Sequence, residues 1–263
     1  MKNSLTLGIL ILLCHNLKAQ ETFAPPINSP QVKARNTQST MRIDGILDEA
    51  DWSMAERIDA FVQKDPVQGN IASMPTEVKI MFDQENLYVG AHCRVPGGRK
   101  DIRVQNLQRD FDYYQNDLFG ISIDGFLDKR NCVAFQTNPY GAQREILVMD
   151  DEIFNREWSG LWKVRTQITD SAWTAEMAIP WKTLRYPAGC QQIGIILTRN
   201  IRARNEYTSF PAVPRAFNVY RMPYEAVLTG INPPPPSFNI QVNPYTLFSF
   251  SNEKKDGVLQ AEK

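Results

Sequence analysis

The sequence predicts an all-β protein, an antiparallel β-sandwich of jelly-roll-like form with one or two short helices. Segments in which apolar and polar residues alternate recur along most of the chain, and clusters of turn-forming residues separate them. Helix-type periodicity is rare, which disfavours a fold that alternates strands with helices. Short strands at near-regular spacing, joined by hairpin turns, are typical of a sandwich.

The predicted strands are defined by period-two alternation. In the segment TEVKIMF, Val78, Ile80 and Phe82 share one face of the expected strand, while Glu77 and Lys79 share the other. The same pattern places strands at 76–82, 87–95, 118–126, 131–138, 143–149, 162–168, 172–179, 192–199 and 225–231.

Turns and short helices connect these strands. Turn-type residues at 83–86, 127–130 and 169–171 predict three hairpins. A helix of about two turns is expected within 48–56. A single turn is expected at 181–184, after Pro180, because proline suits the first helical position.

The first residues have the character of an export signal. Lys2 is followed by an apolar run at 5–14, which is too short to cross a bilayer, since that takes about 20 residues. Ala19 offers a small residue before a cut. We therefore expect a signal peptide at 1–19 and an exported protein.

Beyond the signal peptide, four regions are expected. Pro233–Pro236 cannot join a β-ladder and forms a stiff extended spacer. After it, a strand over 238–250, a charged turn over 252–257 and another strand from Val258 are predicted. The regions are an irregular lead segment at 20–40, the sandwich at 41–231, a polyproline linker at 232–237 and the start of a further β region, predicted to be a truncated barrel, at 238–263.

Composition excludes several classes of function. The chain of 263 residues carries 29 basic and 29 acidic side chains, and this balance disfavours a nucleic-acid partner. Without the signal peptide, His92 is the single histidine, which excludes a histidine-rich zinc site. Cys93, Cys132 and Cys190 then allow at most one disulfide, and Cys93 is expected to be a buried apolar residue.

Several phrases resemble the family 9 carbohydrate-binding modules, in particular a branch found at the front of large outer-membrane β-barrel proteins of Gram-negative bacteria. The phrases occur in order between residues 41 and 230. They are IDGILDEADW at 43–52, TEVKIMFD at 76–83, ND and ID with NPYG between 116 and 141, and WTAE and IPWKTLR between 173 and 185. Each also has a structural reading, with Trp52 in the core, Asp83 holding a turn and Trp181 at a corner.

The resemblance implies a β-sandwich fold. Some members of the family bind sugars and calcium. The resemblance also implies a location in the periplasm or outer membrane and a barrel that follows the prolines. For calcium, the available hard oxygen ligands are Asp44, Asp48 and Asp124. No Asp-x-Asp-x-Asp loop is present, so we assign no firm cofactor.

A sugar site combines aromatic platforms with polar groups that make paired hydrogen bonds. Three clusters have this composition, and packing or solvation of the same residues is the alternative reading of each. The candidate ligand-binding residues are Trp158, Trp162, Arg109, Tyr113, Tyr114 and Arg144.

The leading hypothesis is a secreted, non-catalytic module that binds carbohydrate at the cell envelope. The alternative is a periplasmic interaction or plug domain of an outer-membrane barrel in the same chain. A glycoside hydrolase is the weaker alternative, since no catalytic carboxylate pair is identifiable and His92 is expected at the surface.

Overall fold

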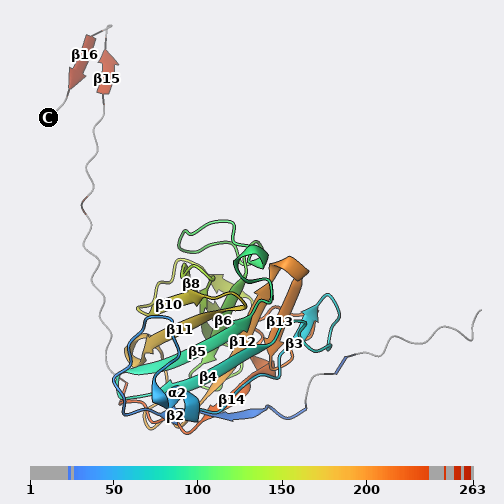
Figure 1. Ribbon diagram of the computed structural model, residues 1–263. Helices are drawn as coiled ribbons and strands as arrows, with labels where there is room; N and C mark the ends of the chain where they lie inside the picture. The colour runs from blue at the N-terminus through green and yellow to red at the C-terminus, as the bar shows by residue number, and fades with distance from the viewer. Residues whose placement is uncertain (1–22, 25–26, 237–245, 247–251, 256–257, 262–263) are drawn as a thin grey trace, which may run out of the picture.

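The computed structural model describes residues 23–24, 27–236, 246, 252–255 and 258–261. Two β-sheets pack face to face and form a sandwich, as predicted (Figure 1). The predicted signal peptide and the predicted strand at 238–250 lie outside the described residues, apart from Thr246. The sandwich therefore accounts for most of the part of the chain that can be described.

The larger sheet, sheet A, has nine strands, and its neighbours are antiparallel except for one edge pair. Its main order is β1 (Gln31–Lys33), β14 (Ala226–Thr229), β12 (Gln192–Ile201), β6 (Leu118–Asp124), β7 (Cys132–Thr137), β8 (Gln143–Met149) and β9 (Ile153–Asn155). Strand β13 (Glu206–Phe210) also pairs with β12, and β3 (Val62–Asp65) pairs with β13.

The smaller sheet, sheet B, has five strands. Its order is β10 (Lys163–Ile168), β11 (Ala172–Pro180), β5 (Asn86–Arg94), β4 (Thr76–Phe82) and β2 (Arg35–Asn36). Only β2 and β4 run parallel in this sheet.

The helical elements are short. They are α2 (Ala50–Met54) and the 3-10 turns η1 (Gly98–Asp101), η2 (Trp181–Thr183), η3 (Arg202–Arg204) and η4 (Met222–Tyr224). Within the described residues no helix has the length and apolar character needed to cross a bilayer. Outside the sandwich, β15 (Asn252–Lys255) pairs with β16 (Val258–Ala261).

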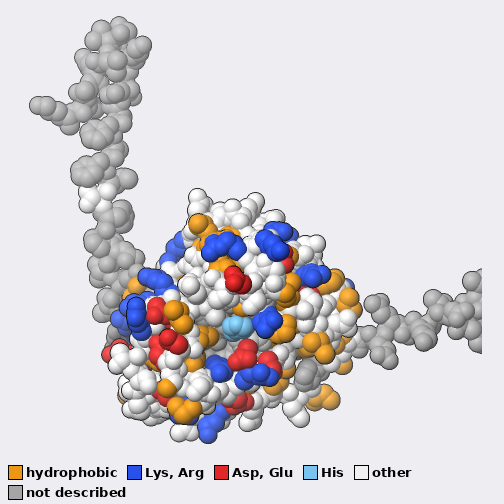
Figure 2. Space-filling model, in the orientation of Figure 1, with side chains coloured by type: hydrophobic (Ala, Val, Ile, Leu, Met, Phe, Trp, Pro, Cys, Tyr) orange, Lys and Arg blue, Asp and Glu red, His pale blue; other side chains and the backbone are white. Residues whose placement is uncertain are grey.

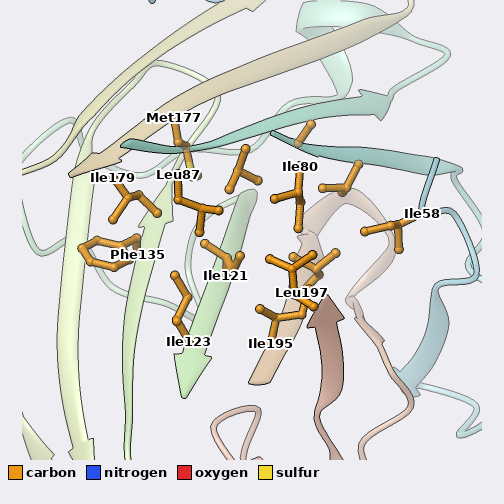
Figure 3. Packing of buried hydrophobic residues seen from close by; sticks show 14 of the residues in the cluster. Ile58, Ile80, Leu87, Ile121, Ile123, Phe135, Met177, Ile179, Ile195 and Leu197 are labelled. Carbon is orange, nitrogen blue, oxygen red and sulfur yellow. The ribbon is translucent and has the colours of Figure 1, made fainter. Parts of the chain in front are cut away.

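The main core lies between the two sheets. Alternation sends Ile80 of β4 and Leu87 of β5 towards Ile121 of β6 and Leu197 of β12, and all four are almost fully buried (Figure 3). Trp181 lies at the margin of this core, where its indole nitrogen donates to the Asp83 carbonyl oxygen at 2.9 Å. The period-two pattern in the sequence therefore marks the inward faces of both sheets.

The outer face of sheet B is covered by the segment that leads into α2. Trp52 is 2% exposed and packs with Met81 and Tyr88. It fits because Gly90 has no side chain, and a Cβ there would lie 2.9 Å from the indole ring. Trp52 is thus part of the core, as predicted.

The phrase that opens this covering segment is held by a buried acid. The Glu176 carboxylate accepts backbone N–H bonds from Asp44 and Gly45 at 2.9 and 3.0 Å. Gly45 has φ of +89°, and a Cβ there would meet the Thr166 backbone at 2.8 Å. Only glycine fits this turn at this distance from β10.

The structure extends the prediction at the edges of the sandwich. The segment 20–40, predicted to be irregular, contains β1 and β2, so the sandwich begins before residue 41. Residues 252–255, predicted as part of a turn, form β15. The edge strands β3 and β9, and β13 between β12 and β3, were also not predicted. Cys93, Cys132 and Cys190 are buried and form no disulfide among the described residues.

Candidate functional site

The outer face of sheet A carries a pocket of about 320 Å³. Two irregular segments, residues 102–117 and 211–225, cover part of this face and leave the pocket between them and β8. Two short strands, β3 and β9, complete its rim. The lining residues are Lys64, Asp65, Tyr113, Tyr114, Arg144, Ile146, Phe154, Arg156, Tyr207, Asn218, Val219 and Tyr220.

Strand alternation and one glycine decide which side chains reach this face. Phe135 and Glu145 point into the sandwich, so their neighbours Gln136 and Arg144, which pair across β7 and β8, point outward. Gly120 lies beside Gln136, and a Cβ there would lie 2.7 Å from its Cγ. The missing side chain lets Gln136 lie across β6 and approach the pocket floor.

Arg144 is held at the pocket by neutral partners. Its Nη1 donates to Gln136 Oε1 and, at 3.1 Å, to the Tyr220 hydroxyl. Gln136 Nε2 donates to the same hydroxyl at 3.0 Å. The guanidinium carbon also lies 5.8 Å from the centroid of the Tyr113 ring. Burial raises the pKa of both Tyr113 and Tyr220, which keeps these phenols neutral.

Aromatic rings form two walls of the pocket. Tyr113 stacks on Tyr207 with centroids 6.3 Å apart, and Tyr114 meets both rings edge-on. Tyr114 is 63% exposed, so most of its ring surface remains open to a ligand. On the other wall, Phe154 meets Tyr220 edge-on with centroids 5.8 Å apart.

The first covering segment is fixed by buried polar side chains. The Asn200 amide donates to the Tyr113 carbonyl oxygen at 2.6 Å. The side-chain oxygen of Asn116 accepts the backbone N–H of Gln105 at 2.7 Å. The Asp117 carboxylate accepts the backbone N–H groups of Arg103 and Arg202. The Asn-Asp pair in the sequence therefore holds the segment that carries the tyrosines, and neither residue lines the pocket.

Asp151 fixes the second covering segment. It adopts a φ of +61°, and its buried carboxylate pairs with Arg221 at 3.0 Å and accepts the Met222 N–H. Its carbonyl oxygen also accepts the Asn218 amide at 3.0 Å. Both aromatic walls are thus carried by loops that are bonded to the body of the sandwich.

The family can be assigned at this point. The model of the family described as "Carbohydrate family 9 binding domain-like" matches residues 43–209, which is more than half of the chain. The chain belongs to this family. We refer to the sandwich below as the family 9-like domain.

Solved structures share the fold of the family 9-like domain. A Bacteroides uniformis protein inferred to bind carbohydrate superposes with a TM-score of 0.63 and 9% identity, over 77% of this chain and 99% of that one. A family 9 carbohydrate-binding module from Caldicellulosiruptor kristjanssonii, in complex with cellotriose, gives 0.53 and 15% over 81% and 100%. Its complex with glucose gives 0.52 and 14%, with the same coverage. At these identities the likeness establishes the fold.

A sequence relative is much longer than this chain. It is endo-1,4-beta-xylanase A of Thermotoga neapolitana, 26% identical over 145 residues. The match covers 54% of this chain and 12% of the xylanase.

The structure divides the predicted ligand residues between two places. Tyr113, Tyr114 and Arg144 line the pocket. Trp158 and Trp162 instead pack edge-on against Phe135 at 6.0 and 5.4 Å. These two tryptophans belong to the inner side of sheet A.

Arg109 belongs with these tryptophans. It pairs with the buried carboxylate of Glu145, which also accepts hydrogen bonds from the Trp162 indole and the Ser159 hydroxyl. The predicted site residues therefore do not form one cluster.

The three predicted calcium ligands do not form a metal site. Among the described residues, no group of three or more His, Cys, Asp or Glu side chains is arranged to hold a metal. Asp44 accepts the Ile46 N–H and pairs with Arg42, and Asp48 is exposed. The carboxylate of Asp124 accepts the N–H groups of Phe126 and Lys129 and so holds its own loop. These residues do not fit calcium.

Next to Asp124, Glu225 is fully buried, and neither of its carboxyl oxygens has a hydrogen-bond partner in the described part of the chain. Gly194 makes room for it, since a Cβ there would lie 1.8 Å from Glu225 Oε2. Burial, with a smaller contribution from the negative charge of Asp124, raises the pKa of Glu225 to about 8. The proton that Glu225 retains limits the charge in this region.

Several pocket residues were not predicted. Gln136 is a polar residue within strand β7. Its outward direction follows from its pairing with Arg144 on β8, because paired residues point to the same face of a sheet. Tyr207 and Tyr220 lie in stretches without clear periodicity. Their place in the pocket depends on contacts between distant segments, which the sequence pattern does not contain.

Proposed function

We propose that the protein is a non-catalytic carbohydrate-binding module and that its ligand occupies the pocket on the outer face of sheet A. The observation that carries this proposal is a pocket lined by five aromatic rings and several planar polar groups, in a chain of the family 9-like group. Related solved modules are complexes with cellotriose and glucose, which supports a sugar as the ligand class.

The chemistry of the pocket suits a sugar ring. The apolar C–H face of a pyranose stacks on an exposed aromatic ring, and Tyr114 offers such a ring at the rim. Ring hydroxyls need donors and acceptors with fixed directions, which Arg144 and Asn218 provide at the pocket wall. Arg144 lies on β8, and the loops that carry Tyr114 and Asn218 are bonded to the sandwich, so little ordering is required on binding.

A binding role is favoured over hydrolysis. Glycosidases use two carboxyl groups that flank the scissile bond. The described lining of the pocket contains one carboxylate, Asp65, which is paired with Arg215 at 2.8 Å. We expect no reducing sugar when the protein is incubated with a glycan panel. Release of product that is lost in Asp65→Asn would establish the hydrolase alternative.

The location proposed for this module is the bacterial cell envelope, after export. The support is the Lys2 start with the apolar run at 5–14. Expression of the full chain in a Gram-negative host, followed by N-terminal sequencing of the periplasmic product, should give Gln20 as the first residue. A product that begins at Met1 and remains in the cytoplasm would contradict this location.

The second candidate function is an interaction or plug domain for a barrel in the same chain. The observation that favours it is the rigid spacer at 233–236 with the β15–β16 hairpin beyond it. The two functions are compatible. Outer-membrane fractionation of the natural protein separates them, because a freely soluble product supports the isolated module.

The binding function is tested by calorimetric titration with neutral and acidic oligosaccharides. Tyr114→Ala should weaken binding of the recognised sugar by about tenfold, because a stacking contact contributes on the order of 1 kcal/mol. Its matched control is Tyr140→Ala, a 43% exposed tyrosine outside the pocket lining, which should leave affinity unchanged. Absence of binding to any sugar, or equal effects of the two substitutions, would overturn the proposal.

A further inference from the structure

The charge of the pocket indicates which sugars it takes. Resting on the proposed function, we infer that the ligand is an anionic glycan, whose carboxylate or sulfate group pairs with Arg144. Uronic acids and sulfated sugars share this chemistry, which is a sugar ring that carries a negative charge. The inference rests on how the cations of the pocket are partnered.

Among the described residues, Arg144 has no acidic side chain as a partner. Its hydrogen bonds from Nη1 go to an amide and a phenol. Its Nε and Nη2 groups have no protein partner in the described part of the chain. The guanidinium is half-buried and lies over the Tyr113 ring. A planar anion that arrives there would meet a fixed fork of donors, the geometry that arginine presents to carboxylates.

Three arginines outside the pocket pair with acids, whereas Arg199 and Arg202 bond to neutral oxygens and have no ion pair among the described residues. Arg109 pairs with Glu145, the residue next to Arg144, but on the inner side of the sheet. Arg130 pairs with Asp150, and Arg221 with Asp151. Arg144 differs from these three arginines because its hydrogen-bond partners among the described residues are neutral. Leaving a partly desolvated cation without a counter-charge has an energetic cost that an anionic ligand offsets.

The other charged residues of the pocket lining are also mostly basic. Arg156 has no ion pair among the described residues, and Lys64 is the third cation. Asp65 is the single lining acid and is paired with Arg215. Lys64 pairs with Asp65 at 3.8 Å and donates to the Arg215 carbonyl oxygen at 3.0 Å, so its charge and one of its donors are already engaged. Arg144 and Arg156 remain as the groups available to an anion.

The experiment compares matched oligosaccharides with the full chain by calorimetry. The probes are a trigalacturonide, a neutral galactotriose and a sulfated galactan oligosaccharide of similar length. In low salt we expect at least tenfold tighter binding of one or both anionic probes than of the neutral one. The preference should shrink in 0.5 M NaCl, because salt screens charge pairs. The tighter of the two anionic probes identifies carboxylate or sulfate as the recognised group.

Variants separate charge from structure. Arg144→Gln should remove most of the anionic preference, whereas Arg144→Lys should retain part of it, since the charge remains but the fork is lost. Arg156→Gln should reduce the preference by a smaller factor. The control is Arg165→Gln, an exposed arginine on β10 outside the pocket. Thermal unfolding of each variant shows whether the fold is intact.

Two results would overturn the inference. One is equal affinity for neutral and anionic probes, which would leave the proposed sugar binding in place. The other is an anionic preference that persists in a folded Arg144→Gln variant. Failure of all three probes to bind, in an otherwise folded protein that also binds no other sugar, counts against the proposed function itself.

Discussion

The two outer faces of the sandwich differ in which side chains cover them and in how their charges are paired. Over sheet B, Trp52 occupies the space left by Gly90, and the covering turn is bonded to Glu176. Over sheet A, the covering loops are bonded just as firmly but leave a pocket with an exposed tyrosine. The segments that cover a sheet, more than the sheet itself, therefore decide which side chains its outer face presents.

Charge separates the two faces as well. A hollow beside α2 on sheet B is lined by Asp48, Glu49, Glu77, Lys79 and His92. Figure 2 shows this side of the molecule, where the pale blue histidine side chain lies among acidic and basic ones. Lys79 lies 3.7 Å from Glu77, so opposite charges are paired within the protein itself. In the sheet A pocket, by contrast, Arg144 and Arg156 have no ion pair among the described residues.

The largest expected effect on stability comes from removing the tryptophan that covers the outer face of sheet B. Trp52→Ala should lower the free energy of unfolding by about 3–5 kcal/mol, because it leaves a large cavity over sheet B. Urea denaturation followed by tryptophan fluorescence measures the change. Met54→Ala, at a 54% exposed position two residues away, is the control and should change it by less than about 0.5 kcal/mol. A loss of less than about 1 kcal/mol in Trp52→Ala would show that this cover is loosely packed.

A smaller loss of stability is expected when one of the loops that cover the outer face of sheet A is released. Asp151→Ala removes the carboxylate that binds Arg221 and the Met222 N–H, and should cost about 2–3 kcal/mol of stability. It should also weaken sugar binding, since Tyr220 and Asn218 lie on the released loop. Asp150→Ala, the exposed neighbour, is the matched control. If sugar affinity is unchanged in a folded Asp151→Ala variant, the loop does not position the site.

The smallest effect is a difference in pH dependence. The pKa of Glu225 is raised from 4.5 to about 8 in the folded chain, so the folded state holds this proton more tightly than the unfolded state. The stability contributed is therefore complete below about pH 4.5 and is lost as the pH rises through about 8. Glu225→Gln should therefore lose less stability than the parent when the pH is raised from 5 to 8.5.

Denaturation at the two pH values tests this prediction, and Glu176→Gln extends it to the other face. Burial raises the pKa of Glu176 to about 7, so the same sign applies, with the loss complete at a lower pH. Identical pH profiles of Glu225→Gln and the parent would mean that Glu225 is solvated in solution.

Much of the fold could be predicted because long strands show their two faces in the sequence. Strand β4 begins and ends where the predicted alternating segment does, and β8 also has its predicted bounds. The strands β1 and β2 are two or three residues long and pair in parallel with β14 and β4. No local pattern defines such strands, because their position depends on the sheets that receive them.

The site was less predictable for a related reason. Aromatic side chains serve packing and ligand recognition equally well. The sequence alone therefore does not distinguish Trp158 and Trp162, which pack, from Tyr113 and Tyr114, which line the pocket. What distinguishes them is the face of sheet A to which each is carried. That assignment depends on Phe135 and Gln136 pointing to opposite sides, and on loops from distant parts of the chain.

The parallel pairing of β1 with β14 also has a mechanical consequence. The chain enters the sandwich through β1 and leaves it after β14, where the Tyr186 hydroxyl is bonded to the Pro234 carbonyl oxygen at 3.1 Å. Tension between residues 30 and 231 therefore runs along two neighbouring strands in opposite directions. Their ladder bonds are loaded together in shear and do not open one at a time. A sandwich built this way resists a pull applied between its two ends better than one whose end strands separate one bond at a time.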